Sequence, residues 1–236
     1  MQTMKKNDVV DVERGTNGKL YPSMEENPQL RWAFIRKVYS ILCIQLLLTF
    51  GIAITMFLVD PIHDFMRAKY GKYVMIASII VTIILLILMH IFSTRHPWNH
   101  LLLFLFTIAV ACTVGAVCTT RKGQAVLVAA GLTLLIVIAL TIFTFVAAKR
   151  GMDLSPFLLC ALLLLFAFGL LRFAMPKEKL LHQVLGCVGA LVFSGFIIYD
   201  TDNIIKRFDY DQYIEAAAGL YLDIINLFMA LLSIGR

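Results

Sequence analysis

Charged residues are scarce in this chain of 236 residues: Asp, Glu, Lys and Arg make up 15% of it, whereas 60% is hydrophobic. Soluble domains contain about 25% charged and about 45–50% apolar residues, so the composition excludes an ordinary soluble fold. Nucleic-acid binding needs a basic face on a soluble domain, and the net charge of +6 comes instead from Lys and Arg between apolar runs. The composition therefore predicts a protein whose main partner is the lipid bilayer, with no nucleic-acid partner.

The chain also lacks paired cysteines and an apolar leader. Its five cysteines lie in or beside apolar runs without a CxxC pair, which favours inert small hydrophobic residues over metal ligands or redox centres. The first 27 residues are polar and charged, so we expect no secretory signal peptide there. Their mixture of charge, Gly and Pro predicts a disordered polar tail over residues 1–27.

Residues 28–236 predict a single all-α membrane domain, a bundle of seven transmembrane helices. Seven apolar segments have roughly the 20 residues that a bilayer requires. They are 38–58, 73–92, 101–118, 125–148, 157–173, 180–205 and 216–234. The short connections leave no room for a soluble catalytic domain. Before the first span, segment 29–39 alternates apolar and basic residues, which predicts a short helix in the headgroup region with Trp32 at the interface.

Two acids interrupt the last two predicted spans: Asp200 and Asp223. A carboxylate near mid-bilayer costs roughly 2.5–3.5 kcal/mol on insertion scales, a cost that Leu or Ile would avoid. The two spans are joined by a tight turn and must run antiparallel, so a rise of 1.5 Å per residue places both acids roughly 8–11 Å below one membrane face. Small and polar residues share their helix faces, so we expect both acids to point into the bundle. These neighbours are Gly186, Gly189 and Asn203 beside Asp200, and Ala216, Gly219, Asn226 and Ala230 beside Asp223.

Two carboxylates that meet in a medium of low dielectric constant cannot both ionise cheaply, so they would share a proton. With that proton the pair would hydrogen-bond one helix to the other. Without it, the acids would repel each other and offer oxygen ligands to a hard cation, which makes Asp200 and Asp223 candidate Ca²⁺ ligands. Arg95 lies in the connection between the second and third spans, on the same side of the membrane, and is a candidate counter-charge. The candidates for an ion path are Asp202, Asn203, Asn226, Asp209, Asp211 and Glu215.

Structural roles for these residues remain open alternatives. An intramembrane Asp can serve as a hydrogen-bonding residue between helices, and Arg95 can serve as a headgroup anchor. The acidic turn can be a solvated loop. Lys and Arg are spread almost evenly over the two sides, so the positive-inside rule does not orient the chain, and only the charged tail favours a cytosolic N-terminus.

Several stretches resemble the transmembrane Bax inhibitor motif family, also called lifeguard. They are LRWAFIRKVYSILCIQLLLTFG, RHPWN, GFIIYDTDNI and GLYLDIINLF, and the ending is most similar to the Golgi anti-apoptotic, lifeguard-type branch. The resemblance implies a seven-helix bundle in endomembranes (Golgi, endoplasmic reticulum or vacuole-type) with a cytosolic N-terminus. It also implies Ca²⁺ leak from stores, suppression of cell death, a pH-sensing pair at Asp200 and Asp223, and a basic latch at Arg95. Some relatives carry an acid in the second span, which segment 73–92 lacks.

The favoured function is therefore a pH-sensitive leak channel, gated by the two acids, that inhibits cell death and transports Ca²⁺ without a bound cofactor. The alternative is a non-conducting regulator of apoptosis and Ca²⁺ signalling, acting through cell-death regulatory proteins. An enzyme is disfavoured. An intramembrane aspartyl protease needs its second acid in a GxGD context, whereas Asp223 lies in GLYLDI.

Overall fold

The computed structural model describes residues 20–21, 24–92, 98–148 and 179–234, and within these ranges it contains helices and no strand. The helices are α2 (Pro28–Leu58), α3 (Asp60–Arg67), α4 (Lys69–Ile91), α5 (Trp98–Thr119), α6 (Gly123–Ala148), α8 (Lys179–Lys206) and α9 (Tyr213–Ile234). All of them except α3 are long and apolar enough to cross a membrane, which confirms an all-α membrane protein with six spans among the described residues. The predicted span over 157–173 lies outside the described residues.

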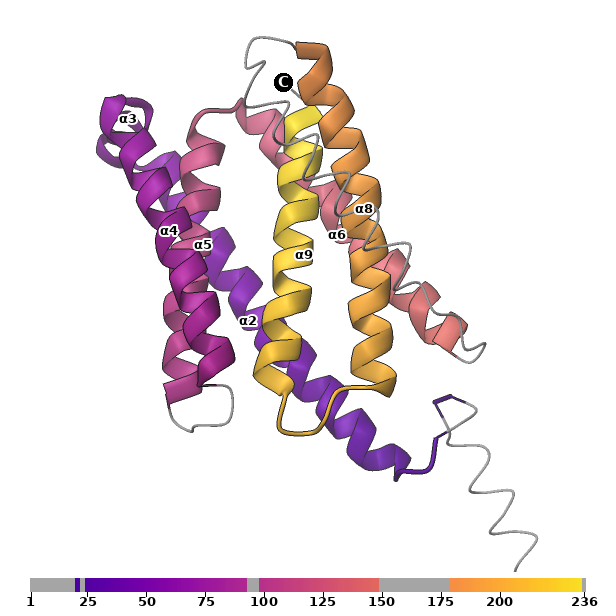
Figure 1. Cartoon of the computed structure of the whole chain (residues 1–236). Helices are drawn as coiled ribbons and strands as arrows, with labels where there is room; N and C mark the ends of the chain where they lie inside the picture. Colours follow the sequence, from indigo (N-terminus) through magenta and orange to yellow (C-terminus); the bar gives the residue numbers. More distant parts are fainter. Residues whose placement is uncertain (1–19, 22–23, 93–97, 149–178, 235–236) are drawn as a thin grey trace, which may run out of the picture.

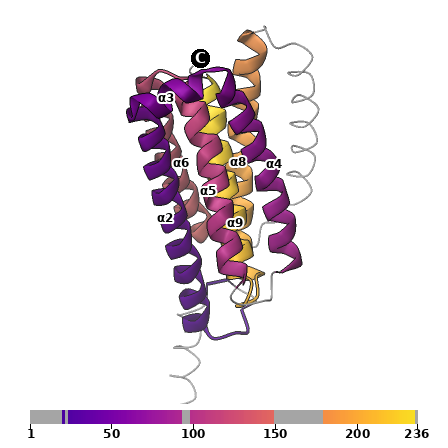
Figure 2. The same cartoon turned by 90° about the vertical axis from the view of Figure 1, so that its left-hand side faces the viewer.

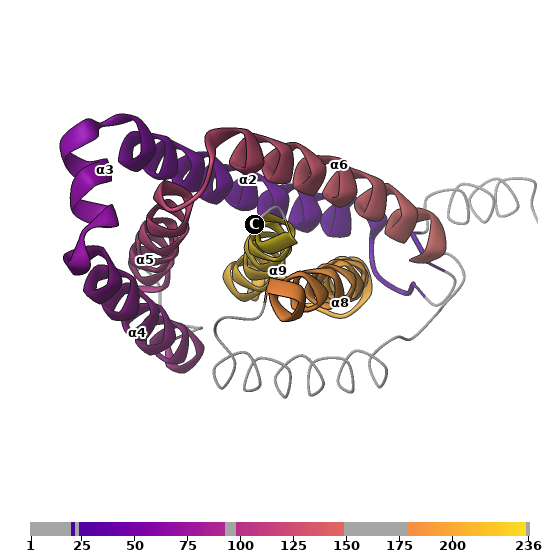
Figure 3. The same ribbon diagram turned by 90° about the horizontal axis from the view of Figure 1, so that it is seen from above.

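Helix α9 occupies the centre of the bundle. Seen from above, α2, α5, α6 and α8 surround it, while α4 lies further out beside α5 (Figure 3). Burial follows this arrangement, since 61% of the most apolar stretch of α9 is buried, against 11% for α4 and for α6. The outer helices expose Ile, Leu and Val side chains that suit a lipid surrounding, and the central helix carries the protein–protein contacts.

Two buried hydrogen bonds join α2 to its neighbours α9 and α5. Thr49 Oγ1 of α2 and Tyr221 Oη of α9 share a buried hydrogen bond of 2.7 Å. Close by, Gln45 Nε2 donates to Thr107 Oγ1 of α5 at 3.1 Å. Because no water competes for these groups in a membrane interior, each bond is retained once the helices pack.

Helix α2 is longer than predicted. It begins at Pro28, where the Asn27 side chain caps the helix by accepting a hydrogen bond from Gln29 N at 2.9 Å, and it continues for 31 residues. At 1.5 Å per residue its length is about 46 Å, which exceeds the roughly 30 Å of the hydrocarbon core. The prediction of a separate headgroup helix over 29–39 is therefore wrong, because these residues are part of α2. Arg31 and Phe34 are 5% and 4% exposed, so these first turns pack on protein instead of lying flat on the membrane.

The end of the predicted tail also packs on the bundle. Met24 is 1% exposed, and Glu26 forms an ion pair with Arg31. The remaining tail residues, 1–19 and 22–23, lie outside the described residues.

The short helix α3 was not predicted from the sequence. It crosses the end of the bundle between α2 and α4, at the end opposite to the α8–α9 turn (Figures 1 and 2). Pro61 near its start, Asp60 in its first turn and Arg67 in its last turn are placed as the geometry and dipole of a helix favour. Its residues are all at least partly exposed, which fits a helix at the membrane surface.

Candidate functional site

The two intramembrane acids lie against each other between α8 and α9. The carboxyl groups of Asp200 and Asp223 are joined by a hydrogen bond. Such a bond forms only when one of the two carboxyls is protonated, because two ionised carboxylates have no donor. Asp223 Oδ2 is buried and has no hydrogen-bond partner among the described residues. The structure thus brings the two acids together inside the bundle, while their role as a pH sensor stays a prediction.

A glycine makes room for the pair. A Cβ atom at Gly219 would lie 2.9 Å from Asp200 Oδ2, so the carboxyl of Asp200 rests directly on the backbone of α9. Further along the same interface, a Cβ at Gly186 would lie 2.9 Å from the Ala230 carbonyl oxygen. Both glycines were predicted to share a helix face with an acid, and their small size allows α8 and α9 to approach closely.

The remaining acids of the predicted ion path form ion pairs or lie on the surface. Asp202 Oδ1 lies 2.6 Å from Lys206 Nζ, one turn further along α8. Glu215 Oε1 lies 3.7 Å from His90 Nδ1 of α4. Asp209 and Asp211 are exposed in the turn between α8 and α9. These acids surround the end of the hairpin, as expected for a polar rim. Within the described part of the chain, none of them forms a hydrogen bond or ion pair with Asp200 or Asp223.

The two predicted amides are placed differently. Asn203 is 9% exposed, and its Oδ1 atom is buried without a hydrogen-bond partner among the residues that the structure describes. Asn226 lies one turn after Asp223 on α9 and lines a cavity. Each amide therefore retains hydrogen-bonding capacity near the pair.

Arg95 lies outside the described residues, so its predicted contact with the pair stays a prediction. The neighbouring helix ends are described. Tyr213 Oη lies 3.3 Å from His100 Nε2, close to the start of α5. This contact places the start of α5 at the same end of the bundle as the α8–α9 turn, as the alternating direction of the spans predicts.

Two cavities approach the pair from opposite ends of the bundle. The first, which we call the turn-side cavity, has a volume of about 240 Å³; Asp211 and Glu215 line its wall, and it reaches Gly219. The second, which we call the basic cavity, has a volume of about 510 Å³ and reaches Asn226. Gly219 and Asn226 are seven residues apart on α9, about 10 Å at a rise of 1.5 Å per residue, and Asp223 lies between them. The acid pair thus lies between the two cavities.

Sequence reasoning missed a cluster at the N-terminal end of α2, which we call the terminal clamp: Glu26, Arg31, Phe208 and Tyr210. Arg31 Nη1 donates to the Phe208 carbonyl oxygen at 2.6 Å, and Arg31 Nε donates to Glu26 Oε1 at 3.0 Å. Tyr210 Oη donates to the other oxygen of Glu26, and the Arg31 guanidinium lies 4.9 Å from the Tyr210 ring centroid. The clamp fastens the α8–α9 turn to the start of α2.

The clamp sets the ionisation of Glu26. Burial by itself raises the pKa of this carboxyl, but hydrogen bonds from Tyr210, Arg31 and Tyr21 outweigh it and hold the pKa below its usual value. One feature of the sequence could have predicted the burial of Arg31. Its spacing from the apolar residues Phe34 and Val38, both buried in the structure, places all three on one helix face. Basic residues near a membrane are usually headgroup anchors, and the predicted headgroup helix over 29–39 places Arg31 at that surface.

No group of three or more His, Cys, Asp or Glu side chains that could hold a metal ion occurs in the described ranges. Ca²⁺ takes 6–8 oxygen ligands, so two carboxyls alone do not complete a coordination shell.

Comparisons with known proteins agree over most of the chain. The family model described as "Inhibitor of apoptosis-promoting Bax1" matches residues 31–235. Protein LIFEGUARD 4 of Arabidopsis thaliana is 47% identical over 233 residues, covering 96% of this chain and 94% of that protein. Protein LIFEGUARD 3 of the same plant is 45% identical over the same shares of both chains. The Golgi anti-apoptotic protein of Vaccinia virus (strain Lister) is 37% identical over 205 residues, covering 87% of this chain and 85% of the viral protein.

Proposed function

Because this chain belongs to the family of inhibitors of apoptosis-promoting Bax1, we propose that it is a pH-sensitive Ca²⁺ leak channel of intracellular membranes that inhibits cell death. The Golgi and anti-apoptotic terms in the name of the viral relative support an endomembrane location and a role in cell death. On this proposal the N-terminus is cytosolic, and the turn-side cavity opens to the cytosol.

The observation that carries the proposal is the hydrogen-bonded contact of Asp200 with Asp223 between two cavities. With a shared proton, the carboxyls hold α8 against α9 and keep the cavities apart. When the proton leaves, two negative charges face each other in a medium of low dielectric constant and repel. The helices then separate, the cavities join, and the carboxylate oxygens attract Ca²⁺. Arg95 is the proposed counter-charge that stabilises one ionised acid.

The test is Ca²⁺ flux into liposomes that contain the purified protein, measured as a function of pH. We expect wild-type flux to rise as the pH rises, and we expect Asp200→Asn and Asp223→Asn each to abolish that dependence. Asp64→Asn is the matched control, because this acid is 83% exposed on α3, at the far end of the bundle. An unchanged pH profile in both pair variants would refute gating by the acids.

A second candidate function is a non-conducting regulator that acts through cell-death regulatory proteins. One observation favours it: three cations, Arg67, Lys72 and Arg121, line the basic cavity, and positive charge opposes the passage of Ca²⁺. Protection from cell death that persists in the Asp200→Asn/Asp223→Asn double variant, in the absence of Ca²⁺ flux, would establish this function in place of the channel.

A further inference from the structure

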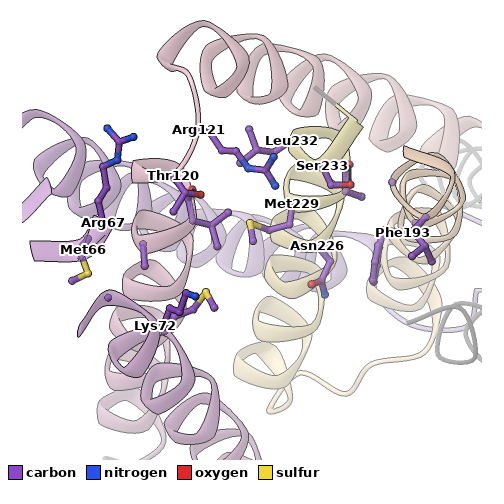
Figure 4. A pocket seen from close by; sticks show the side chains of 18 of the residues that line it. Met66, Arg67, Lys72, Thr120, Arg121, Phe193, Asn226, Met229, Leu232 and Ser233 are labelled. Atoms are coloured by element: carbon purple, nitrogen blue, oxygen red, sulfur yellow. Dashed lines mark hydrogen bonds between the residues drawn. The ribbon is translucent and has the colours of Figure 1, made fainter. Parts of the chain in front are cut away.

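The basic cavity concentrates positive charge at one end of the bundle. Arg67 ends α3, Lys72 lies near the start of α4, and Arg121 follows α5. None of the described residues that line this cavity is acidic. Figure 4 shows Arg121 extending toward Leu232 and Ser233 of α9, with Arg67 at the outer edge of the cavity.

Helix electrostatics account for only part of this cluster. A cation at the C-terminus of a helix interacts favourably with the helix dipole, which suits Arg67. Arg121 lies between the end of α5 and the start of α6, so the two helix dipoles oppose each other there. Lys72 lies three residues after the start of α4, close to the positive end of that dipole, where a cation is unfavourable. Three cations around one hollow give it a positive potential, which favours an anionic ligand.

The wall of the basic cavity changes character with depth. The cations and the hydroxyl of Thr120 lie at or next to helix ends. Deeper in the bundle the wall is formed by apolar side chains, among them Met75, Phe193 and Met229. The volume of about 510 Å³ is typical of small-molecule sites, which range over about 300–1,000 Å³. A charged rim above an apolar wall matches the two halves of a phospholipid.

We propose that the basic cavity is a binding site for a phosphate group, held by Lys72 and Arg121 with Arg67 at its outer edge. A lipid phosphate would also place acyl chains against the apolar wall, whereas free phosphate would use the cations alone. Binding here does not require Ca²⁺ to pass through the protein, so it can be tested whether or not the protein conducts.

The experiment measures binding of short-chain phosphatidic acid to the full-length protein purified in a non-ionic detergent. We expect Lys72→Gln and Arg121→Gln each to weaken binding about tenfold or more, the size expected for the loss of one charge-assisted hydrogen bond. Lys72→Arg should retain binding, because it keeps the charge. The matched control is Lys122→Gln, which removes an exposed cation that neighbours Arg121 but does not line the cavity.

Inorganic phosphate is the second probe and distinguishes the two sources. If phosphatidic acid binds much more tightly than inorganic phosphate, the ligand of the site is a lipid. Equal affinities with the same dependence on Lys72 and Arg121 support the phosphate site and identify the free anion as its ligand. If Lys122→Gln weakened binding as much as Lys72→Gln and Arg121→Gln do, the cations would act only as ordinary headgroup anchors, and the proposal would be overturned. The absence of binding for both probes, in protein whose melting temperature is normal, would overturn it as well.

Discussion

Replacing Gly219 with Ala tests the acid pair without removing either acid. The added Cβ would lie 2.9 Å from Asp200 Oδ2, closer than the roughly 3.5 Å at which non-bonded heavy atoms attract each other. The carboxyl of Asp200 lies at the end of a side chain and can rotate away, and an off-rotamer side chain costs of order 0.5–1.5 kcal/mol. Ala also removes the helix-interior penalty of Gly, about 0.5–1 kcal/mol. The two effects nearly cancel, so we expect the stability to change by less than about 1 kcal/mol.

The same rotation moves the Asp200 carboxyl away from its partner. Because the hydrogen bond to Asp223 needs both carboxyls in place, Gly219→Ala should weaken the contact that holds α8 against α9. If the pair gates the channel as proposed, Ca²⁺ flux at low pH should rise in this variant toward the wild-type level at high pH.

The assays are Ca²⁺ flux in liposomes against pH and thermal unfolding in detergent. Gly131→Ala on α6 is the matched control, because no atom lies within 4 Å of a Cβ at that position. It should raise the stability by up to about 1 kcal/mol and leave the flux unchanged. A Gly219→Ala protein that is normally stable and has a wild-type pH profile would show that the contact between the carboxyls does not close the path.

Three further predictions concern the contacts that hold the bundle together. Arg31→Gln removes the charged hydrogen bonds of the terminal clamp and should lower the free energy of unfolding by about 1.5–3 kcal/mol. Arg36→Gln, at an exposed position of the same helix, should change it little. Equal melting temperatures for the two variants would contradict the role of the clamp. Since hydrogen bonds lower the pKa of Glu26, its contribution is present above the unfolded-state pKa and is lost as the pH falls through the lower folded-state value. The difference in melting temperature between wild type and Glu26→Gln should therefore be full at neutral pH and vanish in strong acid, and a constant difference would refute this linkage. Tyr221→Phe deletes the buried hydrogen bond to Thr49 and should lower the free energy of unfolding by about 0.6 kcal/mol, the average for interhelical hydrogen bonds in a membrane. A double-mutant cycle with Thr49→Val measures the coupling energy between the two side chains. A coupling energy of zero would exclude the bond.

The meeting of the two acids could be predicted because local rules determine it. A tight turn forces α8 and α9 to run antiparallel, and the rise per residue then fixes the depth of Asp200 and Asp223. The helical period brings Gly219 to the face of Asp223, so the close approach of the helices also followed from the sequence. Neither argument needed the position of any other helix.

The terminal clamp and the cavities depend on contacts that no local rule supplies. Glu26 and Tyr210 are 184 positions apart, and their hydrogen bond exists only because α2 packs beside the α8–α9 hairpin. In the sequence, Arg31 looks like a headgroup anchor, because it is a basic residue just before an apolar run. Only its burial in the folded chain shows that it is part of the terminal clamp. The basic cavity is lined by residues of five helices and of the segments next to them, so its shape follows from their packing together.

The clamp constrains how the acid pair can separate. At the turn end, Arg31 donates to the Phe208 carbonyl oxygen, and Lys37 Nζ lies 3.2 Å from the Tyr213 ring centroid, so both sides of the turn are held to α2. Helices behave as stiff rods over this length, so α8 and α9 cannot part equally along their whole contact while that end stays fixed. Loss of the shared proton would instead rotate the hairpin helices apart about the turn, and the displacement would grow with distance from it. The largest opening would then lie around Gly186, where α8 touches α9 at the wall of the basic cavity. Binding of a phosphate group there and opening of the acid pair would act on the same joint between α8 and α9.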